Sequence, residues 1–299
     1  MIKVKVPATS ANIGAGFDSL GVALGLYNYV WAEETDGGLQ IDIKDETEAF
    51  IPKDERNLVY CSMKALFDRV GYKEKGLHLI LENNIMVTRG LGSSSAGIIG
   101  GLLAANEISG NKLSNDELVD LATELEGHPD NVAPALLGGL TVSVADGRKV
   151  KYVKLDMPDD LIFAAFVPNF RLATKKSRSI LPRIVTMRDA AYNLSRSSLF
   201  VASVMTGNYR NIRTAVGDRL HQRYRKKLIP HIDELFNMAY KEGALGVYLS
   251  GSGPTIISIV KNDNSLFYGR MSGYLNKKLS NWQLHMLPCD NTGATVCTE

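Results

Sequence analysis

A glycine-serine run in the first third of the chain has the residue types of a phosphate-binding loop. It reads Arg89-Gly90-Leu91-Gly92-Ser93-Ser94-Ser95-Ala96. Glycines let backbone N–H groups approach a ligand closely, and the apolar run that follows predicts a helix. Free amides and the positive end of a helix dipole form a site for a phosphate. The alternative is a structural turn, but three adjacent hydroxyls exceed what one N-cap needs.

No Gly-Lys-Ser/Thr sequence closes this run, so it is not a Walker A loop, and a metal site must come from elsewhere. Ser114 and Glu117 fit a capping box that starts a helix, and Gly127 fits the position just after its end. Glu126 then lies in the last turn, where the dipole disfavours an anion by about 0.3–1 kcal/mol. Such a carboxylate favours a nearby cation, either an arginine or Mg²⁺ held together with phosphate oxygens.

Two further groups could bind a charged small molecule. A long loop of small and polar residues carries Asn12 and Asp18, which we expect to point into a pocket where Asp18 meets an ammonium or a hydroxyl. The alternative is a tight connection built from Asx turns. Arg178 and Arg225 each precede an apolar-proline step that fixes where the local segment ends. An arginine held rigidly there could bind a carboxylate through two parallel hydrogen bonds.

The elements that must position these residues are a mixture of strands and helices. Alternating or continuous apolar residues predict strands at 2–6 (ended by Pro7), 39–43, 77–81, 161–167 and 255–260. Helical stripes and caps predict helices at 57–70, after the glycine-serine run, at 115–125, at 179–206 (opened by Pro182) and at 228–241. A second glycine-serine turn lies at 248–254. The pattern predicts an α+β protein of two lobes, residues 1–155 and 156–299.

Composition narrows the class of protein. The 34 basic and 32 acidic residues give a net charge of +2, which argues against a nucleic-acid binder that works by bulk phosphate neutralisation. Three widely separated cysteines favour a reducing compartment over a disulfide framework or a zinc site. The N-terminal residues lack the apolar core of a signal peptide, and no apolar run reaches the length of a membrane span. We therefore expect a cytoplasmic protein without membrane contact.

Four blocks, in this order, resemble the GHMP small-molecule kinases and in particular their homoserine kinase branch. The blocks are Pro7–Gly14 with Gly16–Gly21, Arg89–Ala96, His128–Pro134 and Leu249–Thr255. The resemblance covers nearly the whole chain. The chain departs from the family pattern at Met86 and Ala15, where proline is common. The spacer between Glu126 and Asp130 is also short compared with many relatives.

The resemblance implies ATP-dependent phosphorylation of L-homoserine to O-phospho-L-homoserine, on the route to threonine, with ATP and Mg²⁺ as cofactors. Backbone amides of residues 90–95 would hold the ATP phosphates, Ser94 and Glu126 the Mg²⁺, and Asn57 and Val59 part of the adenine. The remaining polar residues would serve the amino acid. Asn12, Asp18 and Asn131 would position it, Arg178 and Arg225 would bind its carboxylate, and Thr174 would lie near the transferred phosphoryl group. Asn131, Thr174 and Arg178 are thus the expected catalytic residues.

The family fold implies an N-terminal lobe like ribosomal protein S5 domain 2 and an α+β C-terminal lobe, with both substrates between them. Homodimers are frequent among these kinases. Asp130 is the only candidate base near Asn131, and our hypothesis is catalysis by orientation and electrostatics without an essential side-chain base. The competing interpretations are another GHMP kinase such as mevalonate kinase, a nucleotide-binding protein without turnover, and glycine blocks that serve only as turns.

Overall fold

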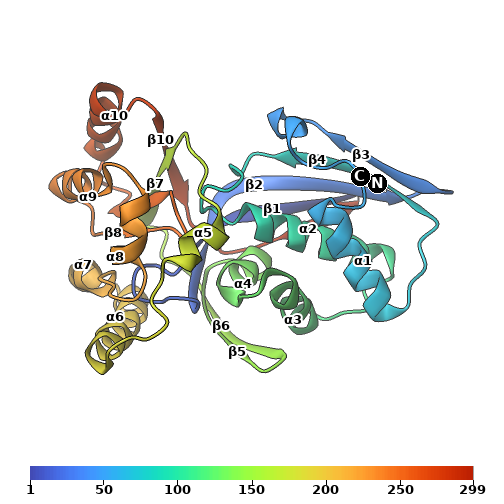
Figure 1. Cartoon of the computed structure of the whole chain (residues 1–299), viewed down its shortest axis with the longest axis horizontal. Helices are drawn as coiled ribbons and strands as arrows, with labels where there is room; N and C mark the ends of the chain where they lie inside the picture. Colours follow the sequence, from blue (N-terminus) through green and yellow to red (C-terminus); the bar gives the residue numbers. More distant parts are fainter. Residues whose placement is uncertain (299) are drawn as a thin grey trace.

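The computed structural model describes residues 1–298 and contains two lobes, each built on one β-sheet (Figure 1). The strands are β1 (Ile2–Ala11), β2 (Leu20–Glu34), β3 (Gly38–Ile43), β4 (Gly76–Asn83), β5 (Leu140–Asp146), β6 (Lys149–Leu155), β7 (Leu161–Pro168), β8 (Gly246–Leu249), β9 (Ile256–Lys261), β10 (Trp282–Pro288) and β11 (Thr295–Thr298). The α-helices are α1 (Leu58–Val70), α2 (Ser93–Ile108), α3 (Asn115–Glu126), α4 (Pro129–Leu137), α5 (Thr174–Ser179), α6 (Met187–Met205), α7 (Ile212–Ala215), α8 (Gln222–Arg225), α9 (Ile232–Lys241) and α10 (Leu266–Lys278). Short 3₁₀ turns lie at Glu46–Ala49, Tyr209–Asn211 and Lys226–Leu228.

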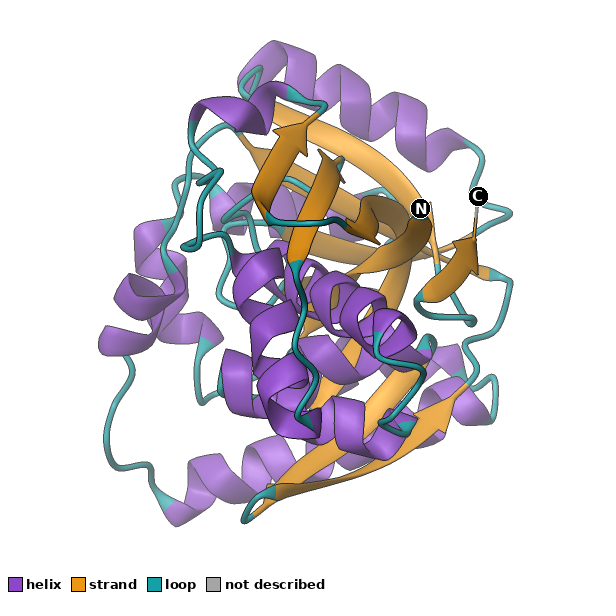
Figure 2. Cartoon of the chain, turned by 90° about the vertical axis from the view of Figure 1, so that its right-hand side faces the viewer, coloured by secondary structure: helices purple, strands orange, loops and turns teal. Residues whose placement is uncertain are grey.

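The first lobe is a sheet with the order β11-β1-β2-β4-β3, to which β5 and β6 are joined through β2. Helices α2 and α4 pack against β1 and β2, and α1 and α3 pack against α2. Figure 2 shows helices between the strands in the upper part of the view and the two long strands along its bottom. Apolar side chains of the sheet and of α2, such as Val6, Val30 and Ile99, are buried between the two layers. The start of α2 is thereby fixed at the end of the sheet that faces the second lobe.

The second lobe is an antiparallel sheet with the order β10-β7-β9-β8. Helices α9 and α10 cover one face, where Phe166, Leu235 and Phe267 share a core. Residues on the opposite face, such as Phe163, join the core that also holds Phe200 of α6. The α+β class and the two-lobed architecture predicted above are confirmed. In the described part of the chain, none of the helices combines the length and the apolar character needed to cross a bilayer.

The chain passes between the two lobes twice, once from β6 to β7 and once from β10 to β11. The second passage brings β11 alongside β1, so the last described strand belongs to the first sheet and the termini lie close together (Figure 1). The two passages are joined by the side chain of Asn291. Its amide donates to the carbonyl of Met157 (2.9 Å), and its oxygen accepts from the N–H of Met157 (2.8 Å). The two connections are therefore bonded to each other.

Several predicted boundaries were wrong. The first strand does not end at Pro7 but runs on to Ala11, because Pro7 lies at a shift of register, where a missing N–H is tolerated. The long strand β2 was not predicted. The helix expected from 179 begins only at Met187, where the side chain of Thr186 caps the N–H of Asp189. The helix expected from 228 begins at Ile232.

Candidate active site

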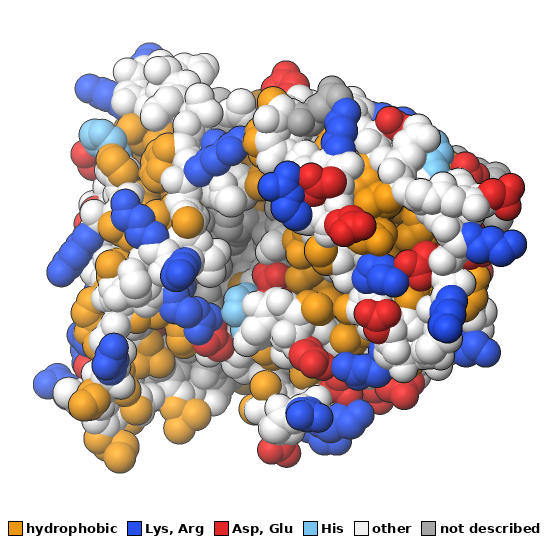
Figure 3. Space-filling view, turned by 45° about the vertical axis from the view of Figure 1, so that its right-hand side comes forward, with side chains coloured by type: hydrophobic (Ala, Val, Ile, Leu, Met, Phe, Trp, Pro, Cys, Tyr) orange, Lys and Arg blue, Asp and Glu red, His pale blue; other side chains and the backbone are white. Residues whose placement is uncertain are grey.

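A cavity of about 370 Å³ opens between the two lobes, and Figure 3 shows the hollow on the molecular surface. It brings together most of the residues predicted for the site, from segments far apart in the chain. These are Asn12, Asp18, Asn57, Val59, Gly90, Gly92, Ser93, Ser94, Glu126, Asn131, Thr174, Arg178 and Arg225. Nucleotide-side and substrate-side candidates therefore share one cavity.

Four residues of the glycine-serine run do not line the cavity. Leu91 and Ala96 are fully buried in the core of the first lobe. The hydroxyl of Ser95 is directed to Glu126. The guanidinium of Arg89 turns away and donates to the carbonyl of Pro168 (3.0 Å). These residues shape the loop, and the side chain of Arg89 supplies no charge to the cavity.

The two glycines of the run are required by backbone geometry. Gly90 and Gly92 have φ of +85° and +70°, which L side chains rarely adopt. A Cβ on Gly92 would lie 1.9 Å from Oγ1 of Thr9, and one on Gly90 would lie 2.6 Å from the carbonyl oxygen of Ser250. Since Gly92 is also the N-cap of α2, it offers no side chain to the first amides of the helix. Those amides stay available to an anion.

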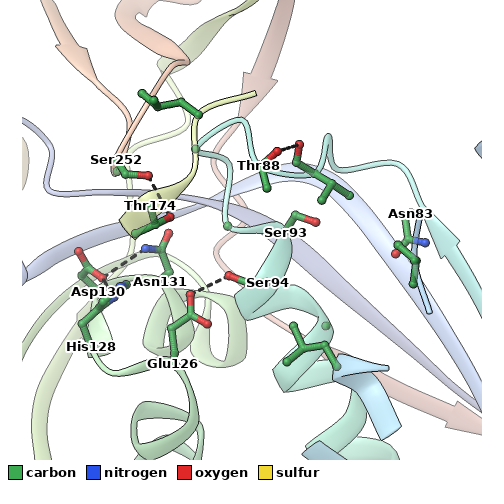
Figure 4. Close-up of a pocket in the computed structure, with 18 of the residues that line it drawn as sticks. Asn83, Thr88, Ser93, Ser94, Glu126, His128, Asp130, Asn131, Thr174 and Ser252 are labelled. Carbon is green, nitrogen blue, oxygen red and sulfur yellow. Dashed lines mark hydrogen bonds and ion pairs between the residues drawn. The ribbon is translucent and has the colours of Figure 1, made fainter. Parts of the chain in front are cut away.

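Glu126 ends α3 next to the start of α2 (Figure 4). Its Oε1 accepts hydrogen bonds from the hydroxyls of Ser94 (2.7 Å) and Ser95 (3.1 Å). The carboxylate thus lies at the unfavourable end of its own helix but at the favourable, positive end of α2. Among the described residues, no arginine or lysine forms an ion pair with it, so the arginine alternative has no support in the geometry.

The oxygen ligands here suit Mg²⁺, which is usually bound by one or two carboxylates together with phosphate oxygens. Within residues 1–298, no group of three or more histidine, cysteine, aspartate or glutamate side chains could hold a metal alone. Neighbouring ligands of an octahedral Mg²⁺ lie about 2.9 Å apart, and the oxygens of Ser94 and Glu126 are 2.7 Å apart. The residues present therefore fit a Mg²⁺ that is completed by a nucleotide.

Asn131, at the start of α4, is held from two sides. Its Oδ1 accepts from the hydroxyl of Thr9 (2.8 Å), and its Nδ2 donates to Oδ1 of Asp130 (3.2 Å). The same carboxylate oxygen lies 2.6 Å from Nδ1 of His128, which must donate because a carboxylate only accepts. Figure 4 shows the three side chains together on one wall of the cavity. The orientation of the Asn131 amide is therefore fixed before any ligand binds.

The pKa of His128 is shifted by opposing causes. Burial, the largest single cause, lowers it, but the hydrogen bond to Asp130 and the nearby carboxylates together raise it above the ordinary value. Because the folded state then holds the proton more tightly than the unfolded state, this pair stabilises the fold at acidic pH. The contribution is complete below the unfolded pKa of about 6.5 and is lost as pH rises through the folded pKa.

We therefore expect the variant His128→Asn to lose more unfolding free energy near about pH 5.5 than near about pH 9. The reason is that the charged His128–Asp130 pair exists mainly at the lower pH. Urea titrations of wild type and variant at both pH values measure the difference. The exposed His231, which pairs with Glu234, provides the matched control His231→Asn. A loss independent of pH would contradict the raised pKa of His128.

Asp18 and Arg178 form an ion pair across the cavity. The guanidinium donates to both carboxylate oxygens, at 2.8 and 3.1 Å. Arg225 lies deeper and is 2% exposed. Burial, and after it the neighbouring Arg178, lowers the pKa of Arg225 to about 10, so it stays charged at neutral pH. The guanidiniums of Arg178 and Arg225 repel each other and therefore favour a nearby anion, whereas the carboxylate of Asp18 favours a cation. Together they are complementary to the carboxylate and the ammonium of an amino acid.

The other end of the cavity is mainly apolar. Ile51, Pro52, Leu58, Val59 and Leu81 line it. Asn57 also lines the cavity, but its side chain already caps α1 and donates to the carbonyl of Pro52 (2.7 Å). Its amide therefore shapes the wall. This apolar space beside the glycine-serine run is suited to a nucleobase.

Sequence reasoning gave little weight to two residues that the structure places at the site. No role was predicted for His128, yet it lines the cavity and bonds to Asp130. A signal was present in the sequence. His128, Asp130 and Asn131 are close neighbours in the chain, and Pro129 between them marks the first position of a helix. Ser252, which lies 3.2 Å from the hydroxyl of Thr174, also lines the cavity. Its block additionally supports the glycine-serine run, since Ser250 hydrogen-bonds to the carbonyl of Gly90.

Comparison with known proteins identifies the family. Residues 57–139 match the model of the GHMP kinase N-terminal domain and residues 200–267 that of the GHMP kinase C-terminal domain. Homoserine kinases of Caldicellulosiruptor bescii and Clostridium botulinum are 48% and 47% identical over 99% of this chain and 97% and 98% of theirs. The crystal structure of homoserine kinase from Cytophaga hutchinsonii superposes with a TM-score of 0.87 at 29% identity, covering 99% of this chain and 97% of that one. The chain therefore belongs to the GHMP kinase family and, within it, to the homoserine kinases.

Proposed function

We propose that this protein transfers the γ-phosphoryl group of ATP to the side-chain hydroxyl of L-homoserine, in the cavity between its lobes. One observation supports this most strongly. The cavity contains both the N-terminus of α2, which suits a phosphate, and the Asp18–Arg178 pair, which is complementary to the charges of an amino acid. The boundary between the two lobes lies near residue 155, and each lobe contributes a different part of the site. The first supplies the nucleotide loop, and the second supplies Thr174, Arg178 and Arg225.

On the nucleotide side, the amides of residues 90–95 would receive the phosphates, and the apolar end near Val59 would receive the adenine. Ser94 and Glu126 would hold Mg²⁺, which supplies charge neutralisation at the β- and γ-phosphates when bound. The hydroxyl of Ser94 is already turned toward the carboxylate at 2.7 Å. Little rearrangement of these two side chains is then needed when a metal binds.

On the substrate side, the ammonium of homoserine would pair with Asp18 and its carboxylate with Arg178 and Arg225. On binding, Asp18 exchanges Arg178 for the substrate ammonium, and Arg178 exchanges Asp18 for the substrate carboxylate. No charge is then left unpaired. Asn12 supports Asp18 by accepting its backbone N–H (3.0 Å). Asn131, with its orientation fixed, would align the hydroxyl, and Thr174 would face the transferred group.

Catalysis then depends on in-line placement and on charge neutralisation, which phosphoryl transfer through a loose transition state mainly requires. Oδ1 of Asp130 already accepts from His128 and Asn131. This supports a positioning role for Asp130 more than the role of a base. An essential side-chain base is not part of the proposal.

The direct test measures ADP release with L-homoserine, R-mevalonate and galactose, each with and without Mg²⁺. Of the three acceptors, we expect only homoserine to be phosphorylated, because mevalonate has no ammonium for Asp18. We also expect this turnover to require Mg²⁺. Release with mevalonate or galactose at equal efficiency would favour another GHMP kinase activity. ATP binding without release for any acceptor would favour a nucleotide-binding protein without turnover. A cytoplasmic location and a homodimer belong to the same proposal, and light scattering of the purified protein tests the dimer.

A further inference from the structure

Arg225 is a buried cation held by neutral groups. Its NH1 donates to the carbonyl of Gly251 (2.8 Å) and lies 3.3 Å from Nδ1 of His221, and its Nε donates to the carbonyl of Ser177 (3.4 Å). Among the described residues, no carboxylate lies within ion-pair distance of it. Its position therefore depends on carbonyl oxygens and on one imidazole nitrogen.

The partners of His221 fix which of its nitrogens carries the proton. Nε2 lies 2.8 Å from the carbonyl oxygen of Gly14, which can only accept, so Nε2 is protonated. Nδ1 faces the guanidinium of Arg225, which can only donate, so Nδ1 is bare. The ring is fully buried, and this burial is the main reason that the pKa of His221 is lowered. The imidazole is neutral at neutral pH and bonds to a different segment with each nitrogen.

The segment that carries His221 is itself fixed. The carboxylate of Asp218, just before α8, accepts from the backbone N–H groups of Leu220, His221 and Gln222, at 2.9, 2.9 and 2.6 Å. Since His221 and Arg225 are four residues apart on a helical turn, their side chains share one face. The imidazole therefore has little freedom to move away from the guanidinium.

The other bond of His221 reaches the turn that carries Asp18. Gly14 has a φ of +71°, and a Cβ there would lie 2.1 Å from the carbonyl oxygen of Val216. Phe17, next to Asp18, stacks on the imidazole with ring centroids 5.3 Å apart. One buried ring thus contacts both the anchor proposed for the substrate carboxylate and the turn that holds the proposed partner of its ammonium.

We propose that His221 is a positioning residue that sets the separation between Arg225 and Asp18 and so adapts the cavity to an α-amino acid. This inference rests on the function proposed above. The neutral ring does not touch the substrate. It supplies the acceptor that orients the guanidinium of Arg225 and the donor that holds the Gly14 turn.

Two variants separate these bonds. In His221→Gln the side-chain amide reaches the place of Nε2 and can donate to Gly14, but the acceptor for Arg225 is lost. In His221→Asn the side-chain oxygen takes the place of Nδ1 and can accept from Arg225. Because a hydrogen bond to a charged group is involved, we expect His221→Gln to raise the KM for homoserine about tenfold or more. We expect the KM for ATP and kcat to change less than about twofold. His221→Asn, which keeps the acceptor for Arg225 but loses the bond to Gly14, should raise the homoserine KM less than His221→Gln does.

The decisive measurement repeats the assay with L-homoserine amide, which has no carboxylate for Arg225. The penalty of His221→Gln should largely disappear with this substrate, whereas a merely structural role would lower the rates with both substrates and with ATP alike. His231→Gln, on the same lobe and exposed, is the matched control. An equal penalty with acid and amide, or an equal rise in both KM values, would overturn the proposal. Wild-type turnover of homoserine, measured first, distinguishes this failure from a failure of the proposed function.

Discussion

Replacing Glu126 with glutamine is expected to lower kcat at least about a hundredfold, because a Mg²⁺ ligand contributes several kcal/mol to the transition state of phosphoryl transfer. The fold should change little. Glu126 accepts two hydroxyl hydrogen bonds but lies where the dipole of α3 disfavours its charge. We expect the loss of unfolding free energy to stay within about 1 kcal/mol. Steady-state turnover across a Mg²⁺ titration measures the first effect, and urea unfolding measures the second.

The matched control is Glu124→Gln on the same helix, where the wild-type residue pairs with Arg69 on the surface. It should leave turnover unchanged. A Glu126→Gln variant with wild-type turnover and an unaltered Mg²⁺ requirement would reject Glu126 as a metal ligand. A variant that binds ATP normally but needs far more Mg²⁺ for turnover would agree with the role proposed here.

The second large effect concerns the ion pair across the cavity. Asp18→Asn and Arg178→Gln are each expected to lower kcat/KM for homoserine about tenfold to a hundredfold, since each removes a charged partner of the amino acid. The KM for ATP should stay near the wild-type value. Initial rates at fixed ATP and varied homoserine measure the effect. Lys175→Gln, an exposed change on the same helix as Arg178, is the control.

The charge-swap variant Asp18→Arg with Arg178→Asp separates two roles of this pair. If the pair only holds the lobes together, the reversed pair restores the contact and with it the activity. If it receives a zwitterion, the reversed charges meet the ammonium and the carboxylate in the wrong order. We expect the double variant to fold and to remain at least as impaired as the single variants.

Local patterns along the chain predicted local structure well. The capping box of Ser114 and Glu117 and the C-terminal glycine of α3, with a φ of +94°, are present as predicted. These features depend only on residues within one or two turns of the chain. The glycine-serine run opens a helix for the same reason.

Features that depend on distant partners were harder to predict. The sequence of β2 lacks a clear alternation of apolar and polar residues, because its first five residues are all buried. The start of α6 was misplaced because Pro182 suggested a helix start, whereas the cap of Thr186 decides it. Asp18 and Arg178 are 160 residues apart, and nothing local to either indicates the other. Their meeting follows only from how the two lobes come together.

The paired chain passages between the lobes also limit how the enzyme can open. A single linker would let one lobe rotate about any axis. Two connections that are bonded to each other through Asn291 and Met157 restrict the rotation to one axis. Rotation about the line through both is the soft movement, and twisting across it strains both backbones at once. The turn that carries Asp18 is bonded to the second lobe through Asn193 and His221, which donate to the carbonyls of Ala15 and Gly14. A rotation about this line therefore carries Asp18 along with Arg178 and leaves their ion pair intact.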